Sequence, residues 1–119
     1  MRTPEGDQIS AIISRHIGAD QSITAPEICL ELGWKPSRYR RVRQIIAAEA
    51  VLWPALVCAK SGDGYFVASN YEEAESYHNW LLELAVLGKM KLLGFRKMLS
   101  QHGLHVPISD AARELGVAA

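Results

Sequence analysis

The stretch WKPSRYRRVRQII, residues 34–46, indicates the fold class and holds the strongest functional signal in the chain. Five positive charges lie between Lys35 and Arg43, and the stretch contains no acidic residue. The whole chain has 119 residues and a formal net charge of zero, so its cations are concentrated rather than in excess. Two explanations are open: a helix face that is simply solvated, or a surface that meets phosphate.

The apolar residues of this stretch recur with helical spacing. At about 100° per residue, Val42 and Ile46 point the same way, and Ile45 and Tyr39 flank them. This pattern predicts the core face of a helix from Ser37 to Ala48. The opposite face then carries Ser37, Arg40, Arg41 and Gln44, with Arg43 at its margin. Arg38 falls nearer the core side, where we expect its stem to lie along apolar surface.

Two shorter helices are predicted before this one. Asp7 can cap a helix from about Gln8 to Ile17, which Gly18 would end. Its apolar stripe consists of Ile9, Ile12, Ile13 and Ile17. One extended rung is expected at Ile23 and Thr24. A second helix then begins near Pro26 and stops at Gly33, because proline suits a first turn and glycine a helix end.

After residue 54 the apolar period changes from helical to alternating. Two strands are predicted here, ALVCAK and YFVASN. They are joined by SGDG at residues 61–64, and an Asp-Gly turn between apolar runs strongly indicates a hairpin. A helix of about 45 Å is predicted from Tyr71 to about His102. A short capped helix, Ser109–Leu115, is predicted near the end of the chain.

This order of elements resembles a winged helix-turn-helix domain of the biotin-repressor-like type, as in small phage and prophage DNA-binding proteins. The resemblance covers residues 8–80 and is carried by TAPEICLELGW, SRYRRVRQII and SGDGYFVASNYEEAESY. It implies a mainly α fold with a small β-hairpin (α+β), a winged helix followed by a long C-terminal helix. Residues 1–70 would form the DNA-binding domain, and residues 71–119 the long dimerisation helix and the short terminal helix. Lys35-Pro36 departs from the family, whose turn is often tighter there.

In helix-turn-helix proteins the second helix of the pair lies in the major groove. Arginine can bind guanine through two hydrogen bonds, and glutamine can bind adenine in the same way. Lys60 is the only cation at the expected hairpin tip, so a weak contribution is expected there. The residues predicted to contact DNA are Lys35, Ser37, Arg38, Arg40, Arg41, Arg43, Gln44 and Lys60.

The long helix is apolar on more than one side. One side can pack within the chain, and a second side fits a C2 homodimer. The residues predicted to form the dimer are Trp80, Leu84, Leu87 and Met90. The alternative is an intramolecular hairpin of two shorter helices that break at Gly88 or Gly94.

Other classes of site have little support in the sequence. His78, His102 and His105 lack a ligand set with metal spacing, so neither a metal nor another cofactor is expected. No residue set supplies a nucleophile, base and orienter together, so we expect no enzyme. Cys29 and Cys58 read as buried thiols, and no signal peptide or membrane span is expected. These features predict a cytoplasmic protein.

The first functional hypothesis is a homodimeric DNA-binding regulator of transcription from a phage or mobile element. A second is a protein-interaction adaptor or inhibitor, in which the cationic helix docks on an acidic protein. A third keeps the DNA contact but serves phage replication or packaging.

Overall fold

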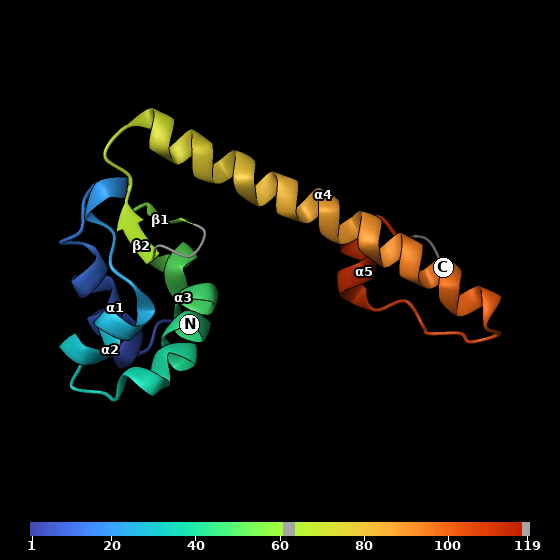
Figure 1. The fold of residues 1–119 in the computed structure, drawn as a ribbon, viewed down its shortest axis with the longest axis horizontal. Coiled ribbons are helices and arrows are strands. Elements are labelled where there is room, and N and C mark those ends of the chain that lie inside the picture. The colour runs from blue at the N-terminus through green and yellow to red at the C-terminus, as the bar shows by residue number, and fades with distance from the viewer. Residues whose placement is uncertain (61–63, 118–119) are drawn as a thin grey trace. The chain divides into compact units, whose positions relative to one another are not determined.

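The structure, a computed structural model, describes residues 1–60 and 64–117. It divides into two compact units, Met1–His78 and Asn79–Ala119. In chain order the elements are α1 (Pro4–Ile13), η1 (Ala19–Gln21), α2 (Ala25–Glu31), η2 (Pro36–Arg38), α3 (Tyr39–Glu49), η3 (Ala50–Leu52), β1 (Val57–Lys60), β2 (Gly64–Val67), α4 (Tyr71–Gln101) and α5 (Asp110–Glu114), where η marks a short 3-10 helix (Figure 1). The predicted fold class, mainly α with one small hairpin and a long C-terminal helix, is confirmed.

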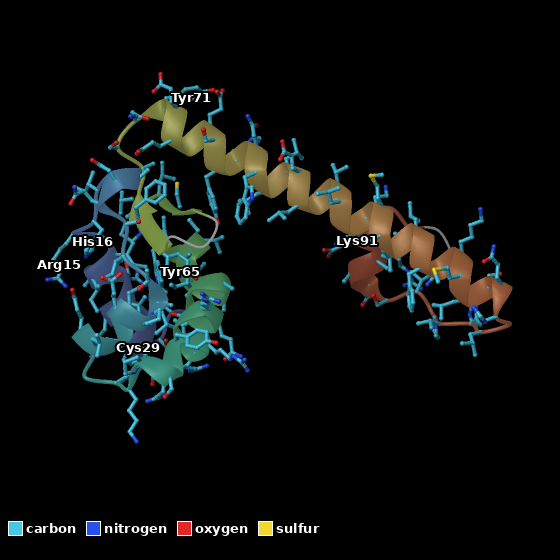
Figure 2. All side chains as sticks on the ribbon, viewed as in Figure 1. Arg15, His16, Cys29, Tyr65, Tyr71 and Lys91 are labelled. Carbon is cyan, nitrogen blue, oxygen red and sulfur yellow. The ribbon has the colours of Figure 1, made fainter. Side chains whose placement is uncertain are left out.

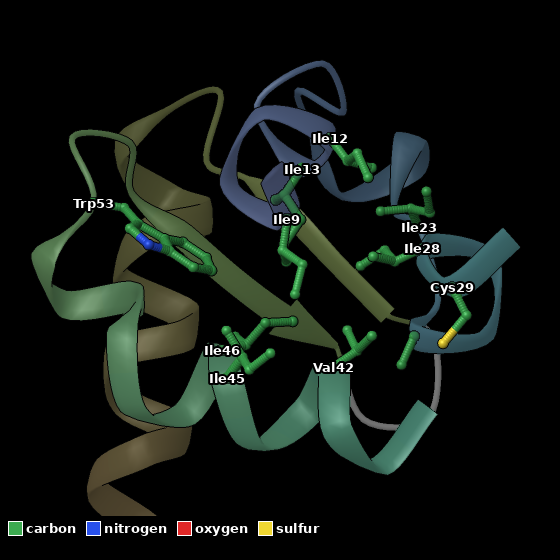
Figure 3. Packing of buried hydrophobic residues seen from close by; sticks show 11 residues of the cluster. Ile9, Ile12, Ile13, Ile23, Ile28, Cys29, Val42, Ile45, Ile46 and Trp53 are labelled. Carbon is green, nitrogen blue, oxygen red and sulfur yellow. The ribbon is translucent and has the colours of Figure 1, made fainter. Parts of the chain in front are cut away.

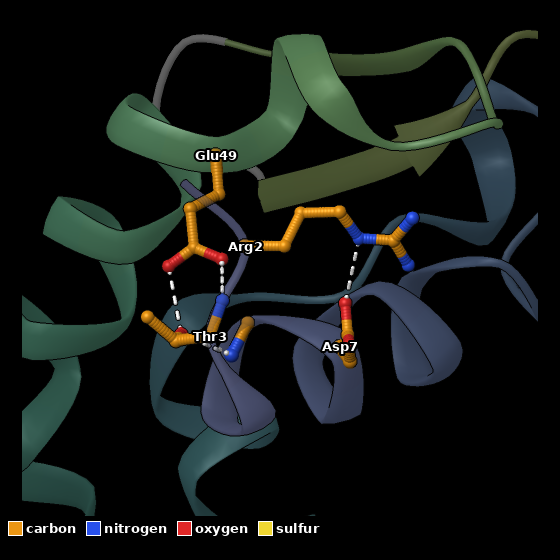
Figure 4. Close-up of polar contacts among 5 residues, drawn as sticks. Arg2, Thr3, Asp7 and Glu49 are labelled. Carbon is orange, nitrogen blue, oxygen red and sulfur yellow. Dashed lines mark hydrogen bonds and ion pairs between the residues drawn. The ribbon is translucent and has the colours of Figure 1, made fainter.

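The first helix begins four residues earlier than predicted. Thr3, rather than Asp7, is its N-cap, and the Thr3 hydroxyl accepts a hydrogen bond from the Gly6 backbone at 3.0 Å. Asp7 instead lies in the first turn, where it accepts from Arg2 Nε at 2.9 Å (Figure 4). The helix ends at Ile13, so Ile17 leaves the predicted stripe and is 58% exposed.

A buried carboxylate explains this earlier start. Glu49, the last residue of α3, is only 4% exposed, and its two oxygens accept hydrogen bonds from Thr3 (Figure 4). The Thr3 backbone N donates at 2.7 Å and its hydroxyl at 2.8 Å. Because a negative charge at a helix N-terminus is favourable, Glu49 both stabilises the start of α1 and joins it to the end of α3.

The second helix follows its prediction within a residue or two. Thr24 and Glu27 form a capping box: the Glu27 N–H donates to the Thr24 hydroxyl, and the Thr24 N–H donates to the Glu27 carboxylate. The hydrogen bond from the Thr24 backbone holds the pKa of Glu27 below its usual value. The helix closes at Gly33, whose φ of 75° suits glycine, and the Trp34 N–H donates to the Cys29 carbonyl at 2.8 Å.

One hydrophobic core holds α1, α2, α3 and the hairpin together. Its fully buried members include Ile9, Ile13, Ile28 and Val42, with Trp53 at one edge (Figure 3). The predicted hairpin is confirmed, with Cys58 opposite Phe66 in an antiparallel register. The predicted extended rung is also confirmed, since Ile23 exchanges two backbone hydrogen bonds with Tyr65.

The start of α4 belongs to the first unit. The Glu73 carboxylate accepts hydrogen bonds of 2.8 Å from the Ala19 backbone and from both the backbone and hydroxyl of Ser69. These contacts attach the first turn of α4 to the loop before α2 and to the end of the hairpin.

The second unit consists of the remainder of α4 and the C-terminal segment. α4 is one continuous helix of 31 residues, so the alternative of a break at Gly88 or Gly94 is wrong. α5 lies alongside α4 (Figure 1), and Ser109 caps it as predicted. In the same unit, Arg96 Nη1 donates to the Val106 carbonyl at 3.2 Å. Among the described helices, none is both long enough and apolar enough to cross a membrane.

Candidate nucleic-acid interface

The cationic helix has its predicted inner and outer faces. Val42, Ile45 and Ile46 are buried in the core. The exposed residues of this segment include Lys35, Ser37, Arg38, Arg40, Arg41, Arg43 and Gln44. The outer face of α3 therefore presents arginine and glutamine side chains to solvent.

The helix begins later than predicted. A 3-10 turn, η2, occupies residues 36–38, and α3 starts at Tyr39 rather than at Ser37. Pro36 suits the first position of this turn, and the Arg38 N–H donates to the Lys35 carbonyl at 2.9 Å. Lys35 and Ser37 consequently precede α3, and the residues at its N-terminus are Tyr39 and Arg40.

Two arginines surround Tyr39. The guanidinium carbons of Arg40 and Arg43 lie 5.9 and 5.1 Å from the centre of the Tyr39 ring. A hydrogen bond from Arg40 and the positive charge of that residue lower the pKa of Tyr39, with a smaller contribution from Arg43. The tyrosine therefore lies beside two exposed cations, a role that the sequence analysis missed although the run YRRVR, residues 39–43, was visible.

Arg43 also lies near the hairpin. Burial raises the pKa of Tyr65 on β2, and the charge of Arg43 partly opposes that shift. The charge of Arg43 therefore reaches Tyr65 on the hairpin as well as the neighbouring Tyr39 ring, while Arg43 itself remains exposed.

Arg38 pairs with an aromatic ring. Its guanidinium carbon is 4.2 Å from the centre of the Trp34 ring, close enough for a cation–π contact. Trp34 is half-buried and packs against the core cluster. Arg38 was expected to lie along apolar surface, and it does so against the Trp34 indole. The Arg38 side chain nevertheless remains exposed.

Arg41 differs from the other cations of the face because it forms an ion pair. Its Nη2 lies 3.4 Å from Glu5 Oε2 on α1, and both side chains are about half exposed. The other cations of this face, Lys35, Arg38, Arg40 and Arg43, form no ion pair with another described residue. The face is therefore less positive around Arg41 than the sequence suggested, and Glu5 is a residue that the sequence analysis did not find.

The hairpin tip belongs to the predicted interface but not to the described structure. Residues 61–63 and the side chain of Lys60 lie outside the part of the chain that the structure describes. The predicted phosphate contact of Lys60 stays a prediction.

Other chemistry has little support in the described residues. Within them, no group of three or more His, Cys, Asp or Glu side chains lies close enough to hold a metal ion. Cys29 and Cys58 are buried thiols, and burial raises the pKa of each. Both sulfurs are therefore protonated at neutral pH and poor nucleophiles.

No family model, curated protein or solved structure matches this chain.

Proposed function

We propose that the first unit binds duplex DNA by placing α3 in the major groove, and that the protein regulates transcription. The observation that carries this proposal is the exposed pair Arg40 and Arg43 around Tyr39, on the outer face of α3. A major groove about 12 Å wide admits one α-helix. The planar guanidinium group suits both guanine edges and phosphate oxygens.

The resemblance to biotin-repressor-like winged helices supports the same proposal and a phage or mobile-element origin. A role in phage replication or packaging would use the same DNA contact. A cytoplasmic location is part of the proposal, because DNA is available there and the buried Cys29 and Cys58 are unpaired thiols.

The ion pair between Arg41 and Glu5 favours a second candidate function. It shows that this face accepts a carboxylate at 3.4 Å. An acidic protein surface offers the same group, so an adaptor or inhibitor that docks through α3 is the alternative to DNA binding.

Salt dependence distinguishes the two candidates. With phosphate contacts from Lys35, Arg38, Arg40 and Arg43, we expect a slope of about −4 for log K against log salt concentration. Affinity for a random-sequence duplex, measured by fluorescence anisotropy, should then fall about 200-fold between 50 and 200 mM salt. A slope near zero, or no binding at low salt, would contradict the DNA proposal and favour a protein partner.

Replacing Glu5 with glutamine is expected to strengthen DNA binding. The change releases Arg41 and removes a negative charge from the rim of the face. Because an exposed ion pair contributes about 0.2–1 kcal/mol, we expect a gain of up to about fivefold in affinity at low salt, measured by the same anisotropy titration.

The matched control for Glu5→Gln is Glu31→Gln. Glu31 also accepts from an exposed arginine, Arg15, but that pair joins the loop after α1 to the end of α2 rather than to α3. Equal gains in both variants would mean that overall charge, not the α3 face, governs binding.

A further inference from the structure

The second unit exposes a regular apolar stripe on α4. Trp80, Leu84, Leu87, Lys91, Gly94 and Met98 recur at alternate spacings of four and three residues, which places them along one side of a helix, with Lys91 as the one charged member. The exposed fractions of the apolar side chains run from 36% at Trp80 to 54% at Leu87 and Met98. Met90, which is 62% exposed, borders this α4 stripe.

The rest of the second unit covers a different side of α4. Lys89, Leu92, Arg96 and Leu99 are half-buried, and their spacing puts them together on one side. Arg96 binds the Val106 carbonyl there, and a side chain at Gly116, just after α5, would lie 3.5 Å from Lys89 Nζ. The α4 stripe is therefore not the surface on which α5 packs.

No contact with the described part of the chain requires a glycine at position 94. A Cβ built there would have no described atom within 4 Å beyond the backbone of its own helix. Glycine inside a helix costs about 1 kcal/mol relative to alanine. A glycine on an apolar stripe leaves a shallow notch, and such a notch permits close approach of another helix or a large side chain.

Charge is distributed unevenly along α4. Its N-terminal half carries exposed acids, Glu75 and Glu83 among them, and its C-terminal half carries exposed lysines, Lys91 and Lys97. Two parallel copies would place like charges together, whereas two antiparallel copies place acids beside lysines.

We infer that the α4 stripe binds the same stripe of a second copy of this chain in antiparallel orientation, with the two-fold axis near Leu87. Trp80 precedes Leu87 by seven residues and Gly94 follows it by seven. Each Trp80 then packs over the notch at Gly94 of the partner subunit. Glu83 and Lys91 lie four residues to either side of Leu87, so each Glu83 lies near Lys91 of the partner subunit. This inference does not depend on DNA binding.

The first test compares two glycines of α4 in the full-length protein. Gly94→Gln fills the notch and is expected to weaken the dimer about tenfold or more, because overpacking an interface is costly. Gly88→Gln is the matched control, since Gly88 also has no described neighbour within 4 Å but lies off the stripe. Glutamine favours helix more than glycine, so neither change should melt α4.

Dissociation constants from sedimentation equilibrium decide the outcome of this comparison. A loss confined to Gly94→Gln supports the inference. A wild-type protein that stays monomeric throughout the micromolar range, or equal constants for the two variants, would overturn it.

The second test concerns orientation. Glu83→Lys and Lys91→Glu are each expected to weaken the dimer, and the double variant Glu83→Lys with Lys91→Glu should restore it. Within one helix these residues are eight positions apart, about 12 Å, so rescue requires a contact between subunits. Failure of the double variant to recover would exclude the antiparallel arrangement.

Discussion

Replacing Arg40 and Arg43 together with alanine is expected to lower the affinity for duplex DNA about 100-fold. Both side chains are exposed beside Tyr39 and have no carboxylate partner among the described residues. The change therefore removes DNA contacts without breaking an internal ion pair. Each arginine contact with a base or phosphate contributes about 1–3 kcal/mol. Anisotropy titration should also show a salt slope reduced by about 2.

Arg15→Ala is the control for this double variant. Arg15 is an exposed arginine of the same unit, paired with Glu31, and Figure 2 shows it on the side of that unit away from α3. Its loss should change affinity by less than about twofold, since exposed ion pairs contribute little. The free energy of unfolding of the double variant should equal that of the wild type. If DNA affinity is unchanged when Arg40 and Arg43 are lost, α3 is not the DNA-binding element.

Gly6→Ala is expected to destabilise the first unit by about 2 kcal/mol. A Cβ at this position would lie 2.1 Å from Glu49 Oε1 and 2.7 Å from Glu49 Cδ. The carboxylate would have to move, but it is buried and held by two hydrogen bonds from Thr3. Hydrogen bonds to charged groups contribute about 1.5–3 kcal/mol each, which outweighs the gain of about 1 kcal/mol from alanine in a helix.

A double-mutant cycle isolates this clash. In a Glu49→Ala background the carboxylate is absent, so Gly6→Ala is expected to be neutral or to stabilise by up to about 1 kcal/mol. Urea unfolding followed by tryptophan fluorescence measures all four free energies. If Gly6→Ala costs the same in both backgrounds, contact with Glu49 is not the reason that glycine occupies this position.

Local patterns in the sequence were enough to predict much of this protein. The spacing of Val42, Ile45 and Ile46 assigned the buried and exposed faces of α3, and the change of period after residue 54 predicted the hairpin. The length of α4 followed from an unbroken helical pattern between Tyr71 and Gln101. These features depend on residues within a few positions of one another, where helical and strand periods are visible directly.

Contacts between residues far apart in the sequence determined the start of α1 and the ion pairing of Arg41, which local patterns did not predict. The first turn of α1 depends on Glu49, which lies 46 residues from Thr3, and the ion pair of Arg41 depends on Glu5, 36 residues away. No local period records either pairing, because each forms only when the shared core brings α1 and α3 together. The sequence therefore specified where the cations lie on their helix, and packing between helices settled which of them meet a carboxylate.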